Sequence, residues 1–158
     1  MEYTIRPLKS AEYRVLEDFL YEAIFIPEGV TPPPREIISQ PELQVYLTDF
    51  GQRAGDYALA AESGGRIVGA VWVRIMNDYG HIDDETPSFA ISLYKDFRGQ
   101  GIGTAMMLEM LELLRNEGYR QASLAVQKAN YAVKMYRKTG FEVVGENDEE
   151  YIMLCRLR

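Results

Sequence analysis

The chain has 158 residues and a formal net charge of −7, with 47% hydrophobic and 26% charged residues. This length and composition predict one globular domain over residues 1–158, and the acidic balance argues against a nucleic-acid-binding surface, which needs a basic stripe. The single cysteine, Cys155, excludes an internal disulfide, and without a CxxC or Cys/His cluster we expect no metal site. Because no apolar segment has the length of a membrane span or of a signal-peptide core, we expect a cytoplasmic protein without membrane contact.

The N-terminal half alternates strand and helix patterns, separated by prolines and glycines. Ser10 is expected to be the N-cap of a first helix, and Ser63-Gly64-Gly65 is a strong hairpin signal between two apolar runs. The irregular, proline-containing region 21–47 is expected to face the substrate. The expected elements are a strand over 3–8, a helix from Ser10 to Ile24, a helix over 37–50 with Leu43, Tyr46 and Leu47 on its apolar face, and strands over 56–62 and 66–75.

The C-terminal half predicts one crossover followed by a strand pair. A strand over 88–94 leads through a glycine-containing loop into an apolar helix that Gly118 closes as the C′ residue. The remaining expected elements are a strand over 121–126, a helix from Asn130 to Gly140, and strands over 141–144 and 151–157. Together these elements predict an α/β fold with hairpins on either side of one β-loop-α-β crossover in a single mixed sheet. We expect an edge strand near Tyr151–Leu157, which could support a homodimer.

The loop Asp96–Gly103 is the strongest functional signal in the chain. Its glycines occupy alternate positions, and its N–H groups, with the dipole of the following helix, suit a phosphate or pyrophosphate. The loop is not a P-loop, because Thr104 rather than lysine follows Gly103. It also lacks the dinucleotide-binding pattern, because the required third glycine is replaced by Thr104 or Met106 and no acidic residue follows Val126.

What remains is Arg98-x-x-Gly101-x-Gly103 between a strand and a helix, which resembles the pyrophosphate loop of the GCN5-related N-acetyltransferase (GNAT) family. Residues Asn130–Phe141 resemble the second signature of the family: an asparagine that opens a helix, then an alanine, a tyrosine, and Gly-Phe at the exit. The resemblance implies one mixed, mostly antiparallel sheet of about six to seven strands flanked by about four helices. It also implies an acetyl-CoA-dependent N-acetyltransferase that acts on a primary amine of a small molecule or protein.

The resemblance further implies the roles of individual residues. Leu93, and less strongly Ile91, would pair through the main chain with the pantetheine arm. Asn130 would hydrogen-bond the cofactor, and Tyr136 would face the thioester sulfur. The pyrophosphate would rest on the backbone of Arg98, Gly99, Gln100, Gly101, Ile102, Gly103 and Thr104.

The general base is the least defined part of the predicted chemistry, because strand 89–93 offers no acid. Glu85 is ranked first, ahead of Asp83, Asp84, Glu62 and His81, and a chain of water molecules is an equal alternative. The Leu93 N–H is expected to stabilise the oxyanion. The acidic segments 83–85 and 146–150 would favour a cationic acceptor if they border the cleft. Two other functions stay open: a non-catalytic CoA-binding sensor, and a transferase for another acyl group or an alcohol acceptor.

Overall fold

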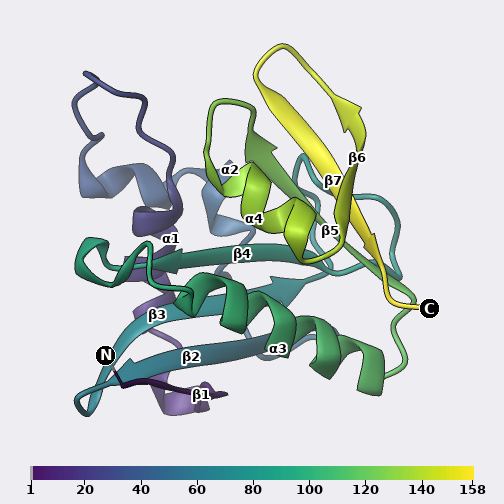
Figure 1. Cartoon of the computed structure of the whole chain (residues 1–158), viewed down its shortest axis with the longest axis horizontal. Coiled ribbons are helices and arrows are strands. Elements are labelled where there is room, and N and C mark those ends of the chain that lie inside the picture. The colour runs from purple at the N-terminus through teal and green to yellow at the C-terminus, as the bar shows by residue number, and fades with distance from the viewer. Residues whose placement is uncertain (1) are drawn as a thin grey trace.

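A computed structural model describes residues 2–158 of the chain. Its centre is a seven-stranded sheet with the strand order β1-β2-β3-β4-β5-β7-β6 (Figure 1). Only β4 and β5 pair in parallel, so the predicted mixed and mostly antiparallel sheet is confirmed. The strands are β1 Thr4–Pro7, β2 Tyr57–Ser63, β3 Arg66–Arg74, β4 Ser88–Leu93, β5 Gln121–Gln127, β6 Phe141–Glu146 and β7 Glu150–Arg156.

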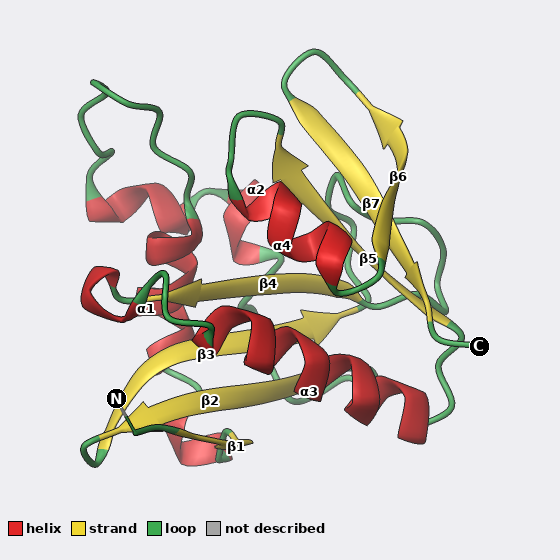
Figure 2. Cartoon of the chain, in the orientation of Figure 1, coloured by secondary structure: helices red, strands yellow, loops and turns green. Residues whose placement is uncertain are grey.

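Helices cover both faces of the sheet. The α-helices are α1 Val15–Ala23, α2 Pro41–Gln44, α3 Ile102–Asn116 and α4 Ala132–Lys138, with short 3₁₀ helices at Ser10–Glu12, Arg35–Ser39 and Lys95–Phe97. Helices α3 and α4 pack on one face, and α1 with α2 packs on the other (Figure 2). In the described residues, no helix combines the length and hydropathy that a bilayer crossing requires.

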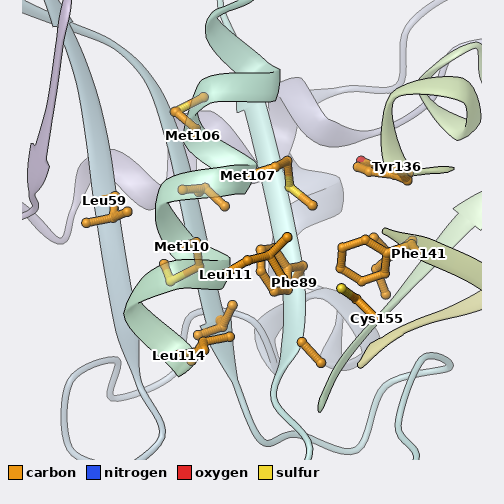
Figure 3. Close-up of a cluster of buried hydrophobic side chains, with 14 of the residues drawn as sticks. Leu59, Phe89, Met106, Met107, Met110, Leu111, Leu114, Tyr136, Phe141 and Cys155 are labelled. Atoms are coloured by element: carbon orange, nitrogen blue, oxygen red, sulfur yellow. The ribbon is translucent and has the colours of Figure 1, made fainter. Parts of the chain in front are cut away.

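The core on the first face depends on α3. Its apolar stripe points at the sheet, and Figure 3 shows Met106, Met107 and Met110 facing the strand residues Leu59 and Phe89. The three methionines are fully buried, and burial of each such side chain contributes about 1.5–3 kcal/mol. Gly118, with φ +94°, ends the helix as the sequence predicts.

The first helix does not begin at Ser10. The Lys9 N–H donates to Glu12 Oε1 at 2.9 Å, and Arg6 Nη1 holds the same oxygen at 2.9 Å. Lys9 is therefore the cap of a 3₁₀ turn that contains Ser10, and α1 begins later, at Val15.

The expected long second helix is also shorter than predicted. Gln40 is extended before Pro41, as the residue before a proline tends to be, so the turn at 35–39 and α2 stay separate. Beyond α2, Arg74 Nη1 donates hydrogen bonds to the Val45 and Thr48 carbonyls at 3.1 and 2.9 Å. These carbonyls are therefore occupied, and turns replace the helix. The predicted apolar face still packs on the core.

The last strand is not an edge strand. β7 pairs with β5 on one side and with β6 on the other, so the expected edge near Tyr151–Leu157 is wrong. The chain forms β6 before it returns as β7, and this hairpin places β6 outermost. A dimer through that edge would therefore use Phe141–Glu146.

Candidate functional site

Strands β4 and β5 separate soon after they meet. A single residue pair, Ser88↔Ser123, links them in register, and from there the strands diverge (Figure 1). On the other side of β4, the Tyr94 N–H donates to the Val68 carbonyl at 3.0 Å. Because backbone groups alternate in direction along a strand, the N–H and C=O groups of Ile91 and Leu93 point away from β3 and into the opening. Apart from the Leu93 carbonyl, which accepts from Arg98 Nε at 2.9 Å, these groups offer an unpaired strand edge to an extended ligand.

The loop after β4 presents a row of unpaired donors. Gly99 and Gly101 have φ angles of +74° and +86°, and Gly101 is the N-cap of α3. Within residues 2–158, no N–H from Gly99 to Thr104 donates to a backbone acceptor. Six successive N–H groups at the start of a 15-residue helix form a site for a phosphate-type anion. A Cβ on Gly101 would meet no atom within 4 Å, so the approach to the loop is open.

A cavity of about 650 Å³ joins the opening to this loop. It collects most of the residues that the sequence assigns to the cofactor: Ile91, Leu93, Arg98, Gly99, Gly101, Gly103, Thr104, Asn130 and Tyr136. Two predicted residues are not among those that line it. The Ile102 side chain is buried in the core, and Gln100 Nε2 donates to the Asp96 carbonyl at 3.0 Å.

Tyr136 lies on α4 at the inner wall of the cavity and is only 9% exposed. Its ring packs edge-on against Phe141 with centroids 6.2 Å apart, and Figure 3 shows the side chain extending from α4 toward β4. Burial, and to a smaller extent Tyr131, raises the pKa of Tyr136 to about 12. The hydroxyl is therefore neutral near pH 7 and can donate a hydrogen bond.

Asn130 lies where β5 gives way to α4. Its Oδ1 accepts the Ala132 N–H at 2.9 Å and closes a turn just before the helix, whose N-cap is Tyr131. The residue also lines the cavity, so this turn and a ligand contact are compatible.

The structure does not bring Glu85 to the cavity. Glu85 is exposed in the loop that precedes β4, at the opposite end of that strand from Leu93. The other ranked acids lie elsewhere as well: Glu62 pairs with Arg6 at 2.9 Å, and Asp84 borders a separate cavity of about 390 Å³ together with His81. Closeness to β4 in the sequence therefore does not predict which acidic side chains line the cavity.

Glu22, which no sequence motif marks as a site residue, lines the cavity from the end of α1. Its Oε1 accepts from Arg98 Nη2 at 3.2 Å, and Arg98 Nε donates to the Leu93 carbonyl at 2.9 Å. No local pattern reveals a contact between residues 76 positions apart. Part of the irregular region expected to face the substrate also lines the cavity: Ala23, Ile24, Phe25, Ile26, Val30 and Pro32.

Comparisons with known proteins agree on one family. The chain matches the model of the "Acetyltransferase (GNAT) family" over residues 20–141. N-acetyltransferase 8 from Rattus norvegicus is 34% identical over 103 residues, which are 65% of this chain and 45% of that protein. Mycothiol acetyltransferase from Thermobifida fusca is 31% identical over 101 residues, 61% of this chain and 31% of that protein. The chain thus spans less than half the length of these relatives.

Solved structures share the fold at low sequence identity. An N-acetyltransferase from Staphylococcus aureus Mu50 superposes with a TM-score of 0.74 at 17% identity, over 100% of both chains. PaiA N-acetyltransferase from Thermoplasma acidophilum, in complex with coenzyme A, gives 0.72 at 17% identity over 99% of both chains. A phosphinothricin acetyltransferase from Sinorhizobium meliloti, in complex with AcCoA, gives 0.69 at 20% identity over 99% of this chain and 89% of that one.

Proposed function

This chain belongs to the GNAT acetyltransferase family, and we propose that it binds acetyl-CoA in the cavity beside α3 and transfers the acetyl group to a primary amine. The main support is the continuity of two features: the unpaired N–H groups of residues 99–104 adjoin the free backbone edge of Ile91 and Leu93. The first feature suits a pyrophosphate and the second an amide-containing arm, in the order in which coenzyme A carries them.

The cofactor contacts follow from this geometry. The N–H groups from Gly99 to Thr104 would hold the pyrophosphate at the positive end of α3. Ile91 and Leu93 would pair with the pantetheine amides as an added strand does, and Asn130 would contact the same arm from the other wall. The thioester then lies between β4 and Tyr136.

In the proposed reaction, the amine nitrogen bonds to the thioester carbonyl carbon, the C–S bond breaks, and the nitrogen loses one proton. The Leu93 N–H is used by the pantetheine arm in this arrangement, so the Ile91 N–H, which lies further from the loop, stabilises the oxyanion, and the Tyr136 hydroxyl donates a hydrogen bond to the leaving sulfur. Because the pKa of Tyr136 is about 12, well above that of a thiol, full proton transfer to the sulfur is unfavourable. The sulfur leaves as a thiolate that takes a proton from water, so the products are the acetamide and the free thiol of coenzyme A.

The acceptor must lose a proton before it attacks. A primary amine with a pKa of about 10 is only about one part in a thousand neutral at pH 7. Since Glu85 lies away from the cavity, we assign proton removal to a chain of water molecules that leads to solvent.

Calorimetry with acetyl-CoA on a matched pair of variants tests the cofactor site. Gly101→Glu puts a carboxylate where the pyrophosphate would lie, and it should abolish binding. Gly65 has a similar φ of +76° and equally open surroundings, but it lies in the β2–β3 turn, so Gly65→Glu should leave binding unchanged. Equal affinity for both variants would refute the placement. Binding without thiol release on any amine would favour a non-catalytic CoA sensor.

A further inference from the structure

The proposed cofactor would contact β4, the loop after it and α4. One wall of the cavity then has no assigned role. This wall is part of residues 23–32, here called the arch, and its lining side chains are Ala23, Ile24, Phe25, Ile26, Val30 and Pro32. Among the described residues, Ile24, Phe25 and Ile26 belong to neither of the two hydrophobic core clusters. Val30 is 52% exposed. Apolar side chains that face a cavity and lack core neighbours are typical of a ligand-binding surface.

The arch is held in place at its base. Arg35 pairs with Asp18 on α1, and its guanidinium lies 5.9 Å from the centroid of the Tyr21 ring. The Tyr21 hydroxyl donates to the Pro33 carbonyl. These contacts join the two ends of the arch, so its apolar side is a preformed wall and needs little ordering when a ligand binds.

The charge around the cavity is sparse despite the acidic chain. Glu22 is the only carboxylate residue that lines it within residues 2–158, and Arg98 already pairs with that carboxylate. The acidic segments 83–85 and 146–150 do not line it. A ligand with several positive charges would therefore find no second anion here.

From these observations we propose that the acceptor is an apolar monoamine, with its hydrocarbon or aromatic body on the arch and its single amino group directed toward the thioester between β4 and Tyr136. The inference rests on the proposed function, because it assumes that acetyl-CoA occupies the opposite wall. Burial of one aromatic or branched side chain on such a surface is worth about ten- to hundredfold in kcat/KM.

Thiol release from acetyl-CoA, measured with four amines, tests the substrate class. 2-Phenylethylamine and leucinamide should exceed spermidine and glucosamine by about tenfold or more in kcat/KM. Preference for spermidine or glucosamine would overturn the proposal.

A pair of valine variants tests the arch itself. Val30→Asp should lower kcat/KM for 2-phenylethylamine about tenfold and leave the Kd of acetyl-CoA unchanged. Val144 is similarly exposed, at 50%, but lies on β6 away from the cavity, so Val144→Asp should change neither value. Equal kinetics for the two variants would overturn the proposal, as would an equal loss of acetyl-CoA affinity in Val30→Asp, which would make the arch a cofactor wall.

Direct binding separates this inference from the proposed function. If no amine is acetylated, calorimetry of 2-phenylethylamine with the CoA-loaded protein replaces the kinetic assay. Binding that Val30→Asp abolishes would support the apolar acceptor site while the transfer reaction fails. Absence of binding in that experiment would overturn the inference as well.

Discussion

Arg98 joins Glu22 through an ion pair of 3.2 Å and so connects the loop after β4 to the end of α1. The same guanidinium donates to the Leu93 carbonyl at 2.9 Å and to the Glu22 carbonyl at 3.3 Å. One side chain therefore holds together the loop, the open end of β4 and the start of the arch. The proposed cofactor wall and the proposed acceptor wall meet at this residue.

Replacement of Arg98 should loosen the loop. Arg98→Ala removes three hydrogen bonds that fix the loop against β4 and α1, so we expect the Kd of acetyl-CoA to rise about tenfold, or about 1.4 kcal/mol. Glu22→Gln keeps an acceptor oxygen for Arg98 and should raise the Kd less. Calorimetry on both variants measures the effect, and an unchanged Kd in Arg98→Ala would contradict it.

Tyr136→Phe should lower kcat by about ten- to a hundredfold with little change in the KM of acetyl-CoA, because the lost hydrogen bond acts on the leaving sulfur. Since the pKa of Tyr136 is about 12, its ionisation should produce no loss of wild-type activity between about pH 7 and pH 10. Steady-state kinetics across this range measures both effects. Tyr79→Phe, in the exposed loop before β4, is the control. A kcat equal to wild type in Tyr136→Phe would remove the role assigned to this residue.

Features encoded by neighbouring residues are predictable from this sequence. The Ser63–Gly65 turn, the loop Arg98–Gly103 and the apolar stripe of α3 each depend on local backbone geometry or on helical spacing, and each is found where expected. The prediction of a long second helix is wrong because Arg74, which is remote in sequence, donates hydrogen bonds to the Val45 and Thr48 carbonyls. The helix propensity of the residues near position 45 contains no information about the Arg74 side chain, which competes for these carbonyls.

The same distinction explains the candidate site. The loop and strand residues of the proposed cofactor wall lie in one continuous segment, so a local motif is enough to predict that Leu93 and Gly101 lie close together. Glu22 reaches the cavity only because α1 packs beside β4, and Glu85 is excluded because β4 runs away from it. Side chains contributed by other elements depend on tertiary packing, which the sequence of one segment does not reveal.

The fully buried pair Arg74–Asp56 should be important for stability. The side chains are 0% exposed, with Arg74 Nη2 and Asp56 Oδ2 3.0 Å apart, and Arg74 anchors the turns at 45–48. Asp56→Ala would leave a buried, unpaired guanidinium and should lower the free energy of unfolding by about 3–5 kcal/mol. Urea denaturation measures this loss. Asp18→Ala breaks the exposed Arg35 pair and should cost less than about 1 kcal/mol. Equal losses in the two variants would contradict the prediction.

Asp78 lies in the loop between β3 and β4 and is partly buried. Ser88 Oγ and the Tyr46 hydroxyl donate to its Oδ2 at 2.8 and 3.2 Å, whereas its buried Oδ1 accepts no hydrogen bond from the described residues. Burial raises the pKa of Asp78 against the opposing effect of these donors, and the nearby Glu150 also has a raised pKa, caused mainly by burial.

A raised carboxyl pKa means that the folded state disfavours the charged form of Asp78. The resulting loss of folding stability is fully present above the folded pKa of Asp78, and it disappears below the unfolded pKa of about 3.9. Asp78→Asn should therefore raise the free energy of unfolding at pH 8 relative to wild type, and the gain should shrink toward zero near pH 4. Urea denaturation at pH 8, 6 and 4 measures this difference. Asp84→Asn, at a side chain that is 96% exposed, should show no such trend. A destabilisation by Asp78→Asn that is equal at all three pH values would mean that the hydrogen bonds from Ser88 and Tyr46 outweigh the charge.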